Sequence, residues 1–294
     1  MSGAPVVVCV GCLTLDVQHV VERVPERNEK TVGLGQRVTF GGPAANAAAT
    51  AAALGAGAHL VAPFGRCPVT AFVAAALSAA GVRWVDPSGA LDNPSPVSSL
   101  LVDRATGERA VVSGGVMSVP AGATLPAGLV ADSDAVLLDG HAMTLARQAA
   151  RQARARGIPV VLDGGSHKPG LADLLPEVDL AILSGDFVAP GGGDPLAWAH
   201  RCGARHVARS DGPHEVAVLA EGRRFAVPVP AVPAERVVDT VGAGDVLHGA
   251  AVVAAATLGV GTAAQARAVL EFAVEVATRS VQAPGALGWA DLGG

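Results

Sequence analysis

The chain has 294 residues, of which 50% are hydrophobic and only 3% aromatic, and its formal net charge is −5. This acidic balance, without any basic run, argues against a dedicated nucleic-acid or anionic-membrane surface. No apolar run reaches the ~20 residues of a membrane-spanning helix, and no basic segment of a signal peptide precedes the first strand pattern, so we expect a cytoplasmic protein. The length suits a single domain over residues 1–294.

The first strand pattern is followed by an excursion from the main sheet. Residues 5–12 are apolar and β-branched, as in a strand buried on both faces, and Asp16 then falls where open α/β sheets bind ligands. A turn-forming Asp is an equally common interpretation. Residues 17–39 form short alternating pieces, and residues 97–113 have a hairpin pattern, so we expect these two segments to build a small second sheet.

A glycine pair opens the first predicted helix. The sequence Gly41-Gly42-Pro43-Ala44-Ala45-Asn46 runs into an alanine tract that ends before Gly55, which predicts a helix over residues 43–54. The glycines allow a ligand close to the backbone, and Asn46 offers a donor and an acceptor from the first turn. A low-complexity alanine tract is the weaker alternative, because a strand pattern resumes at residues 59–62.

From residue 134 onward, predicted strands and helices alternate regularly. Three of the strands end in polar or glycine residues, namely Asp163-Gly164-Gly165, Ser184-Gly185-Asp186 and Ser210-Asp211-Gly212. Because the carboxyl ends of parallel strands meet at one edge of a sheet, these residues predict a shared crevice.

The stretch Asp239-Thr240-Val241-Gly242-Ala243-Gly244-Asp245 lies between a strand-like segment, 236–238, and a long helix expected to open at about Asp245. Small residues let several N–H groups converge at a helix start, where the macrodipole adds roughly half a positive charge and favours a phosphate. A carboxylate beside such a site needs a role, and accepting a proton from a hydroxyl that attacks phosphorus is one. No G-x-x-x-x-G-K-[ST] sequence offers another phosphate cradle. His248, one turn further on, is expected to be a packing or rim residue.

Taken together, the motifs resemble the ribokinase-like, or PfkB, family of carbohydrate kinases. The glycine motif with Gly55, and the later motif with Gly249-Ala250, stand in the family's order about 200 residues apart on a βα chain. Residues 9–16, their spacing to Gly41, and the run 245–250 look most similar to the ketohexokinase and sulfofructose kinase branch.

The resemblance implies a three-layer α/β/α fold with a mostly parallel central sheet and a small β-sheet lid, acting with ATP and Mg²⁺. Asp245 would be the base, and the N–H groups of Gly242, Ala243 and Gly244 would form the anion hole. Other implied contacts are with the sugar (Asp16, Asn28, Gly41, Gly42 and Asn46), with the nucleotide (Ser210, Gly212 and Thr240), and with a monovalent cation such as K⁺ (Asp239 and Val241). Lid sheets of the family often pair between subunits, and an exposed sheet edge favours such pairing, so we expect a homodimer.

One departure from the family concerns magnesium. The acidic N-x-x-E segment that orders magnesium-bound water is replaced by residues 184–189, which leaves Asp186 as the substitute. We therefore weigh three functions: a sugar kinase acting on a primary hydroxyl of a ketose or related sugar, a nucleoside kinase, and a catalytically silent sugar-binding relative. The aromatic-poor lid disfavours the nucleoside kinase, and the intact Asp245 disfavours the silent relative.

Overall fold

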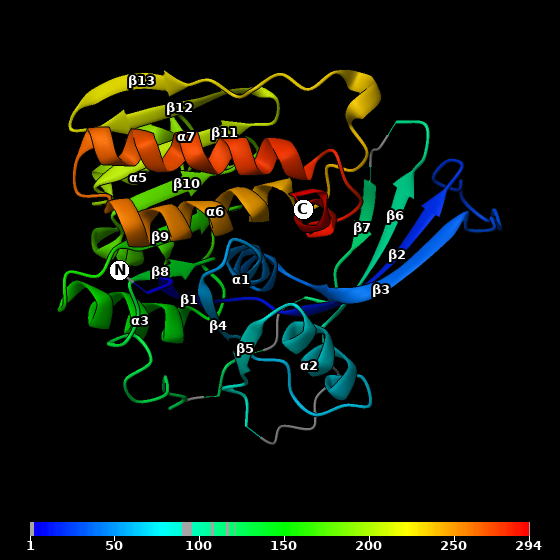
Figure 1. Ribbon diagram of the computed structural model, residues 1–294, viewed down its shortest axis with the longest axis horizontal. Helices are drawn as coiled ribbons and strands as arrows, with labels where there is room; N and C mark the ends of the chain where they lie inside the picture. The colour runs from blue at the N-terminus through cyan, green and yellow to red at the C-terminus, as the bar shows by residue number, and fades with distance from the viewer. Residues whose placement is uncertain (1–2, 90–95, 107–108, 116–117, 121, 294) are drawn as a thin grey trace.

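The computed structural model describes residues 3–89, 96–106, 109–115, 118–120 and 122–293, and it contains two β-sheets (Figure 1). The strand order of the large sheet is β13-β12-β11-β10-β9-β8-β1-β4-β5, and β3-β2-β6-β7 form the small one. The large sheet consists of β1 (Val6–Val10), β4 (Gly57–Val61), β5 (Val82–Val85), β8 (Ala135–Leu138), β9 (Val160–Gly164), β10 (Leu180–Leu183), β11 (His206–Asp211), β12 (His214–Ala220) and β13 (Arg223–Val227).

Helices cover both faces of the large sheet, so the predicted three-layer α/β/α arrangement is confirmed. Alternate residues of β1 enter two different hydrophobic cores: Val7 and Cys9 face one, and Val8 and Val10 face the other. The first core is closed by α1 (Pro43–Ala53), α2 (Thr70–Ala79), α6 (Ala243–Leu258) and α7 (Ala263–Ser280), and the second by α3 (Met143–Arg154), α4 (Leu171–Leu174) and α5 (Pro195–Arg201). Short 3₁₀ turns are η1 (Leu175–Glu177), η2 (Ala234–Arg236) and η3 (Gly288–Gly293).

The order of the strands determines where a ligand can bind. Strand β1 pairs in parallel with β4 on one side and with β8 on the other, and the chain continues outward in both directions from there. Such a reversal of strand order opens a crevice at the carboxyl ends of the strands. The ends of β1, β8 and β9 therefore define the candidate site.

The alanine tract is a closely packed helix. Seven of the eleven residues of α1 are buried, and a Cβ atom at Gly249 of α6 would lie 2.6 Å from the carbonyl oxygen of Ala47. Small residues on both helices thus allow their backbones to touch. This contact fixes the first turn of α1 relative to the first turn of α6.

The small sheet stands to one side of the main body in Figure 1 and joins the two expected lid segments. It contains β2 (Thr14–Val21), β3 (Gly35–Gly41), β6 (Val97–Asp103) and β7 (Arg109–Val112). Strand β2 pairs antiparallel with β3 and parallel with β6, while β6 and β7 form the expected antiparallel pair. The loop residues 107–108 of that pair lie outside the described residues.

Two local predictions were wrong. Residues 236–238 are not a strand, because η2 ends at Arg236, the N–H of Val237 donates back to the carbonyl of Ala234, and that of Val238 donates to the carbonyl of Val281. Helix α6 begins at Ala243, two residues earlier than expected, since Gly242 with φ of 78° supplies the turn before it. No helix among the described residues combines the length and the apolar character needed to cross a membrane.

Candidate active site

The two sequence motifs meet at one hydrogen bond. Asn46, in the first turn of α1, donates through Nδ2 to Oδ2 of Asp245, in the first turn of α6, over 2.6 Å. The two residues are 199 positions apart in the sequence, and the close packing at Gly249 brings their helices together. The crevice predicted from the strand ends therefore contains both the glycine motif and the predicted base.

The start of α6 presents free backbone donors. The N–H of Ala243 donates to the carbonyl of Thr240 over 3.3 Å, whereas those of Gly242, Gly244 and Asp245 have no backbone or side-chain acceptor among the described residues. A Cβ atom at Gly244 would meet no atom within 4 Å, so the space in front of the helix is open. This arrangement suits an anion. It differs from the predicted anion hole at one position, because the N–H of Ala243 is already bonded and that of Asp245 is free instead.

The carboxyl group of Asp245 is tuned for proton transfer. Burial and, next, the negative charge of Asp163 raise its pKa to about 7, while the hydrogen bond from Asn46 and the nearby His248 oppose the rise. A general base works best when its pKa lies near the operating pH. Asp245 therefore has both the position and the proton affinity of a base.

Asp139 is a residue that sequence reasoning missed. It is fully buried at the carboxyl end of β8, and its Oδ2 accepts the N–H groups of Cys12 over 2.7 Å and of Ala44 over 3.2 Å. Burial opposes its ionisation, but hydrogen bonds, chiefly from His141, hold the pKa of Asp139 below its usual value. Its anionic carboxylate ties the end of β1 to the start of α1. The sequence could have pointed to Asp139, because Asp139-Gly140 follows one predicted strand as Asp163-Gly164 ends the next.

The predicted sugar side of the crevice is a cavity of about 320 Å³ between the small sheet and the loop 284–288. Ligand pockets begin at about this size, on the order of 300 Å³. Its polar lining includes Asp16, whose Oδ1 accepts the hydroxyl of Thr14 over 2.6 Å and whose pKa is raised by burial. Asn46 also lines this cavity, so the sugar side and Asp245 are contiguous.

A side chain would not fit at either glycine of the first motif. A side chain at Gly41 would collide with the carboxylate of Asp16. Gly42 has φ of 97°, and a Cβ atom there would lie 2.7 Å from the carbonyl oxygen of Cys12. They therefore shape the cavity that Asp16 lines.

Three polar lining residues of the small sheet were not predicted: Gln18, Arg37 and Thr39. They share a face with Asp16, because Asp16 pairs with Thr39 and Gln18 with Arg37. The two-residue period of a strand could have predicted these residues, because it places Gln18 on the same face as Asp16. By contrast, Asn28 is exposed in the β2–β3 connection, and the structure does not place it among the residues that line the cavity.

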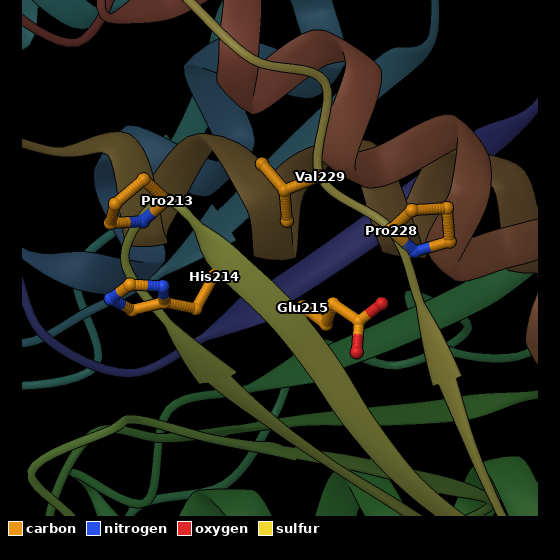
Figure 2. Close-up of a pocket in the computed structure, with 5 residues that line it drawn as sticks. All are labelled: Pro213, His214, Glu215, Pro228 and Val229. Atoms are coloured by element: carbon orange, nitrogen blue, oxygen red, sulfur yellow. The ribbon is translucent and has the colours of Figure 1, made fainter.

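The segment predicted to bind the nucleotide lies at the same edge of the large sheet. The hydroxyl of Ser210 donates to the carbonyl of Leu183 over 3.4 Å, and Gly212, with φ of 55°, forms the turn between β11 and β12. Directly beside it is an open hollow of about 580 Å³, shown in Figure 2, whose lining residues are Pro213, His214, Glu215, Pro228 and Val229. Thr240 is exposed just before the anion site.

The predicted metal residues lie in two places, since Asp239 and Val241 are together in the loop before α6 and Asp186 follows β10. The carboxylate of Asp239 accepts the N–H groups of Val241 over 2.8 Å and of Gly285 over 2.9 Å, so it braces the loop before α6. Asp186 is exposed after β10. Within the described ranges, no group of three or more His, Cys, Asp or Glu side chains is arranged to hold a metal ion.

A small lid-like sheet, a helix start with free N–H donors and a buried carboxyl group beside it form an arrangement that suits a small-molecule phosphotransferase. This chain belongs to the pfkB family of carbohydrate kinases, whose family model matches residues 5–290, and it is a carbohydrate kinase. It is 25% identical to ribokinase of Arabidopsis thaliana over 276 residues, which cover 86% of this chain and 71% of that protein.

Solved structures show the same fold. The structure of Arabidopsis thaliana ribokinase complexed with ribose and ATP has a TM-score of 0.74 and 23% identity, with 97% of this chain and 95% of that chain covered. Ribokinase from Thermotoga maritima has a TM-score of 0.76 and 20% identity, with the same coverage of 97% and 95%. The predicted ribokinase-like fold is confirmed, and the likeness to the ketohexokinase branch stays a prediction.

Proposed function

We propose that the protein transfers the γ-phosphoryl group of ATP to a primary hydroxyl of a ketose or related sugar. The observation that carries this proposal is the 2.6 Å hydrogen bond between Asn46 and Asp245. It joins the wall of the sugar cavity to the base and to the free N–H groups at the start of α6. A hydroxyl held at this junction would face both the base and the phosphoryl group.

The reaction then follows from the geometry. Asp16 and Asn46 hold sugar hydroxyls between the glycine pair, Gly41 and Gly42, and the lid. Asp245 accepts the proton of the attacking hydroxyl, whose oxygen bonds to the γ-phosphorus while the bond to the bridging oxygen breaks and ADP leaves with that electron pair. The free N–H groups and the helix dipole stabilise the charge on the transferring oxygens.

The hollow beside Ser210 and Gly212 is our candidate for the nucleotide base. It follows the nucleotide segment directly and offers the aliphatic faces of two prolines and a valine. The ribokinase of Arabidopsis thaliana, which shares this fold, was solved with ribose and ATP. Thr240, exposed just before the start of α6, is proposed to contact the phosphates. Because ATP is the donor, a cytoplasmic location is part of this proposal.

The residues present fit Mg²⁺ that arrives with the nucleotide. Mg²⁺ commonly keeps several waters and binds one or two carboxylates together with substrate phosphates, so a dedicated cluster is not required. Asp186, exposed at the carboxyl end of β10, would supply that carboxylate; bound Mg²⁺ neutralises phosphate charge. For K⁺, the carbonyl groups of Asp239 and Val241 remain our candidates, because hydrogen bonds at Asp239 hold this loop against the segment 281–285.

A nucleoside kinase and a silent relative find less support. Among the described residues that line the cavity, Phe40 is the one aromatic side chain. A nucleobase would be bound better by stacking on several aromatic rings. A silent relative has no need of a carboxyl group whose pKa is raised to about 7 beside an anion site. The substrates of the ribokinase relatives make ribose the main competitor of a ketose.

A coupled assay for ADP separates these functions. The purified protein is incubated with ATP, Mg²⁺ and a panel of ketoses, aldoses including ribose, and nucleosides. We expect ADP release to depend on a ketose and the product to carry phosphate on a primary carbon by ³¹P NMR. Turnover of nucleosides alone, or calorimetric sugar binding without turnover of any compound, would contradict the proposal.

We further propose a homodimer that pairs through the small sheet. Its outer face carries exposed apolar side chains, since Val38 and Val112 are 42% and 73% exposed. The register places both on the same face as Val17 and Ser99, opposite to the face of Arg37. An exposed apolar sheet face of this kind is typical of an interface.

A further inference from the structure

His248 is a buried histidine at the junction of three elements beneath the candidate site. It lies in the second turn of α6 and is only 4% exposed. Its Nδ1 is 2.6 Å from the carbonyl oxygen of Gly244, and its Nε2 is 3.1 Å from the carbonyl oxygen of Ile182 on β10. The carboxylate of Asp163, buried at the end of β9, is 3.4 Å from the same Nδ1.

These contacts determine the charge on the ring. A carbonyl oxygen can only accept a hydrogen bond, and a neutral imidazole has one N–H donor and one lone pair. Either neutral tautomer of His248 would therefore point a lone pair at a carbonyl oxygen. An imidazolium donates to both carbonyls. Burial raises the pKa of Asp163, and the positive charge of His248 opposes this rise and so favours the carboxylate that balances the ring.

We propose that His248 is an imidazolium paired with Asp163, and that this pair is a positioning device for the proposed phosphoryl transfer. It acts on the peptide between Gly244 and Asp245. The proposal rests on the proposed function and adds to it two residues that the reaction scheme above does not use.

The first effect of the pair is on the anion site. The carbonyl of Gly244 and the N–H of Asp245 belong to one peptide group, and that N–H is among the free donors at the start of α6. A charged donor on the carbonyl side polarises the peptide and strengthens its N–H as a donor, because hydrogen bonds in a chain reinforce one another. The contact also fixes the plane of the peptide.

The second effect is on the base. His248 interacts with Asp163 of β9, with Asp245 of its own helix and with the carbonyl of Ile182 on β10. The charges of Asp139, just after β8, and of Lys168 and His141 also act on Asp163. The charge of Asp163 raises the pKa of Asp245, and that of His248 lowers it. Removing the imidazolium leaves Asp163 uncompensated, so the pKa of Asp245 rises.

Histidine NMR on the intact protein tests the charge directly. With ¹⁵N-labelled histidine, we expect both ring nitrogens of His248 to carry a proton at pH 8, because each faces a carbonyl oxygen. In Asp163→Asn, which keeps the size of the side chain, His248 should be neutral at pH 8. A neutral His248 in the wild-type protein at pH 8 would overturn the proposal.

Kinetics test the positioning role. In His248→Gln, the acidic limb of the pH profile of kcat/KM should move to higher pH by about one unit, and kcat should fall about 10-fold, less than the ~10²–10³-fold loss of a whole anion-hole donor. KM for the sugar should stay within about twofold, as expected for an interaction made in the transition state.

The matched control is His206→Gln. His206 is fully buried at the amino-terminal end of β11, whereas the candidate site lies at the carboxyl ends of the strands. Burial lowers the pKa of His206, so it is neutral. This variant should keep the wild-type pH profile. An unmoved acidic limb in His248→Gln would overturn the positioning role. A wild-type protein that turns over no sugar would instead overturn the proposed function, while the NMR experiment would still decide the charge of the pair.

Discussion

At Asp245 the requirements of catalysis and of folding oppose each other. Its carboxyl group has an ordinary pKa of 3.8, and burial followed by the charge of Asp163 raises the folded-state value to about 7. Between these two pH values the folded protein binds a proton that the unfolded chain has released. The stability that belongs to the protonated carboxyl group is therefore present below pH 4 and is lost as the pH rises through 7.

A neutral isostere should remove this loss. We expect Asp245→Asn to raise the melting temperature relative to the wild type more at pH 8 than at pH 4, because the asparagine has no proton to lose. The difference in unfolding free energy at pH 8 is on the order of a few kcal/mol. Calorimetry at the two pH values measures it, and the exposed Asp186→Asn serves as the control. An equal effect of Asp245→Asn at both pH values would contradict the raised pKa.

The sequence could predict which residues meet in the crevice where a local motif contains them, and their catalytic and binding roles stay predictions. Asp245, Asn46 and the glycines stand in motifs whose backbone geometry is set by their own neighbours. The roles of Asp139 and His248 arise instead from contacts with β1 and β9, which lie far away in sequence. Such contacts leave no local pattern, and a histidine in an apolar helix is typical of packing.

Among the elements, the contact between α1 and α6 is what assembles the site. Gly249 sits where a Cβ atom would lie 2.6 Å from the carbonyl oxygen of Ala47 and 2.7 Å from the Cβ atom of Thr50. Backbone cannot give way as a flexible side chain can, so a larger residue must push the helices apart. The first turns that carry Asn46 and Asp245 would move with them.

We therefore expect Gly249→Val to destabilise the protein by about 1–3 kcal/mol, as overpacking of a core does. Denaturant unfolding provides the measurement. The matched control is Gly244→Ala in the same helix, where the added Cβ atom meets nothing within 4 Å and alanine favours helix. This control should be as stable as the wild type or more so. A stable Gly249→Val would show that the two helices can separate without cost.

Most elements could be predicted because their patterns are local. The alanine tract, the alternating βα units and the hairpin at residues 97–113 each match a period or a turn signal, and the structure bears them out. The strand expected at 236–238 failed since Val237 and Val238 have the β-branched composition of a strand but no partner strand. Strand composition does not show whether a partner is available.

At the scale of the whole molecule, the small sheet has two faces with different roles. One face lines the cavity through Gln18 and Arg37, and the guanidinium of Arg37 reaches the C-terminal loop, where any side chain at Gly285 would collide with it. The other face is the proposed dimer interface. Pairing of two small sheets would cover the exposed apolar face and brace each lid over its cavity.

Analytical ultracentrifugation tests this assembly. We expect the wild type to sediment as a dimer at micromolar concentration, and Val38→Glu with Val112→Glu to sediment as a monomer, because two buried carboxylates would oppose association. Val188→Glu is the matched control, since Val188 is also 73% exposed but lies outside the small sheet. A wild type that is monomeric over the whole concentration range would disprove the dimer.

The central claim is that this kinase uses Asp245 as the base that activates a sugar hydroxyl. The most direct measurement compares turnover and sugar binding in the wild type and in Asp245→Asn, with ADP release followed by the coupled assay and sugar affinity by calorimetry. The account predicts that kcat falls about 10²–10⁴-fold, the usual contribution of a general base, while the sugar Kd stays within about twofold. An Asp245→Asn protein with wild-type kcat would contradict it.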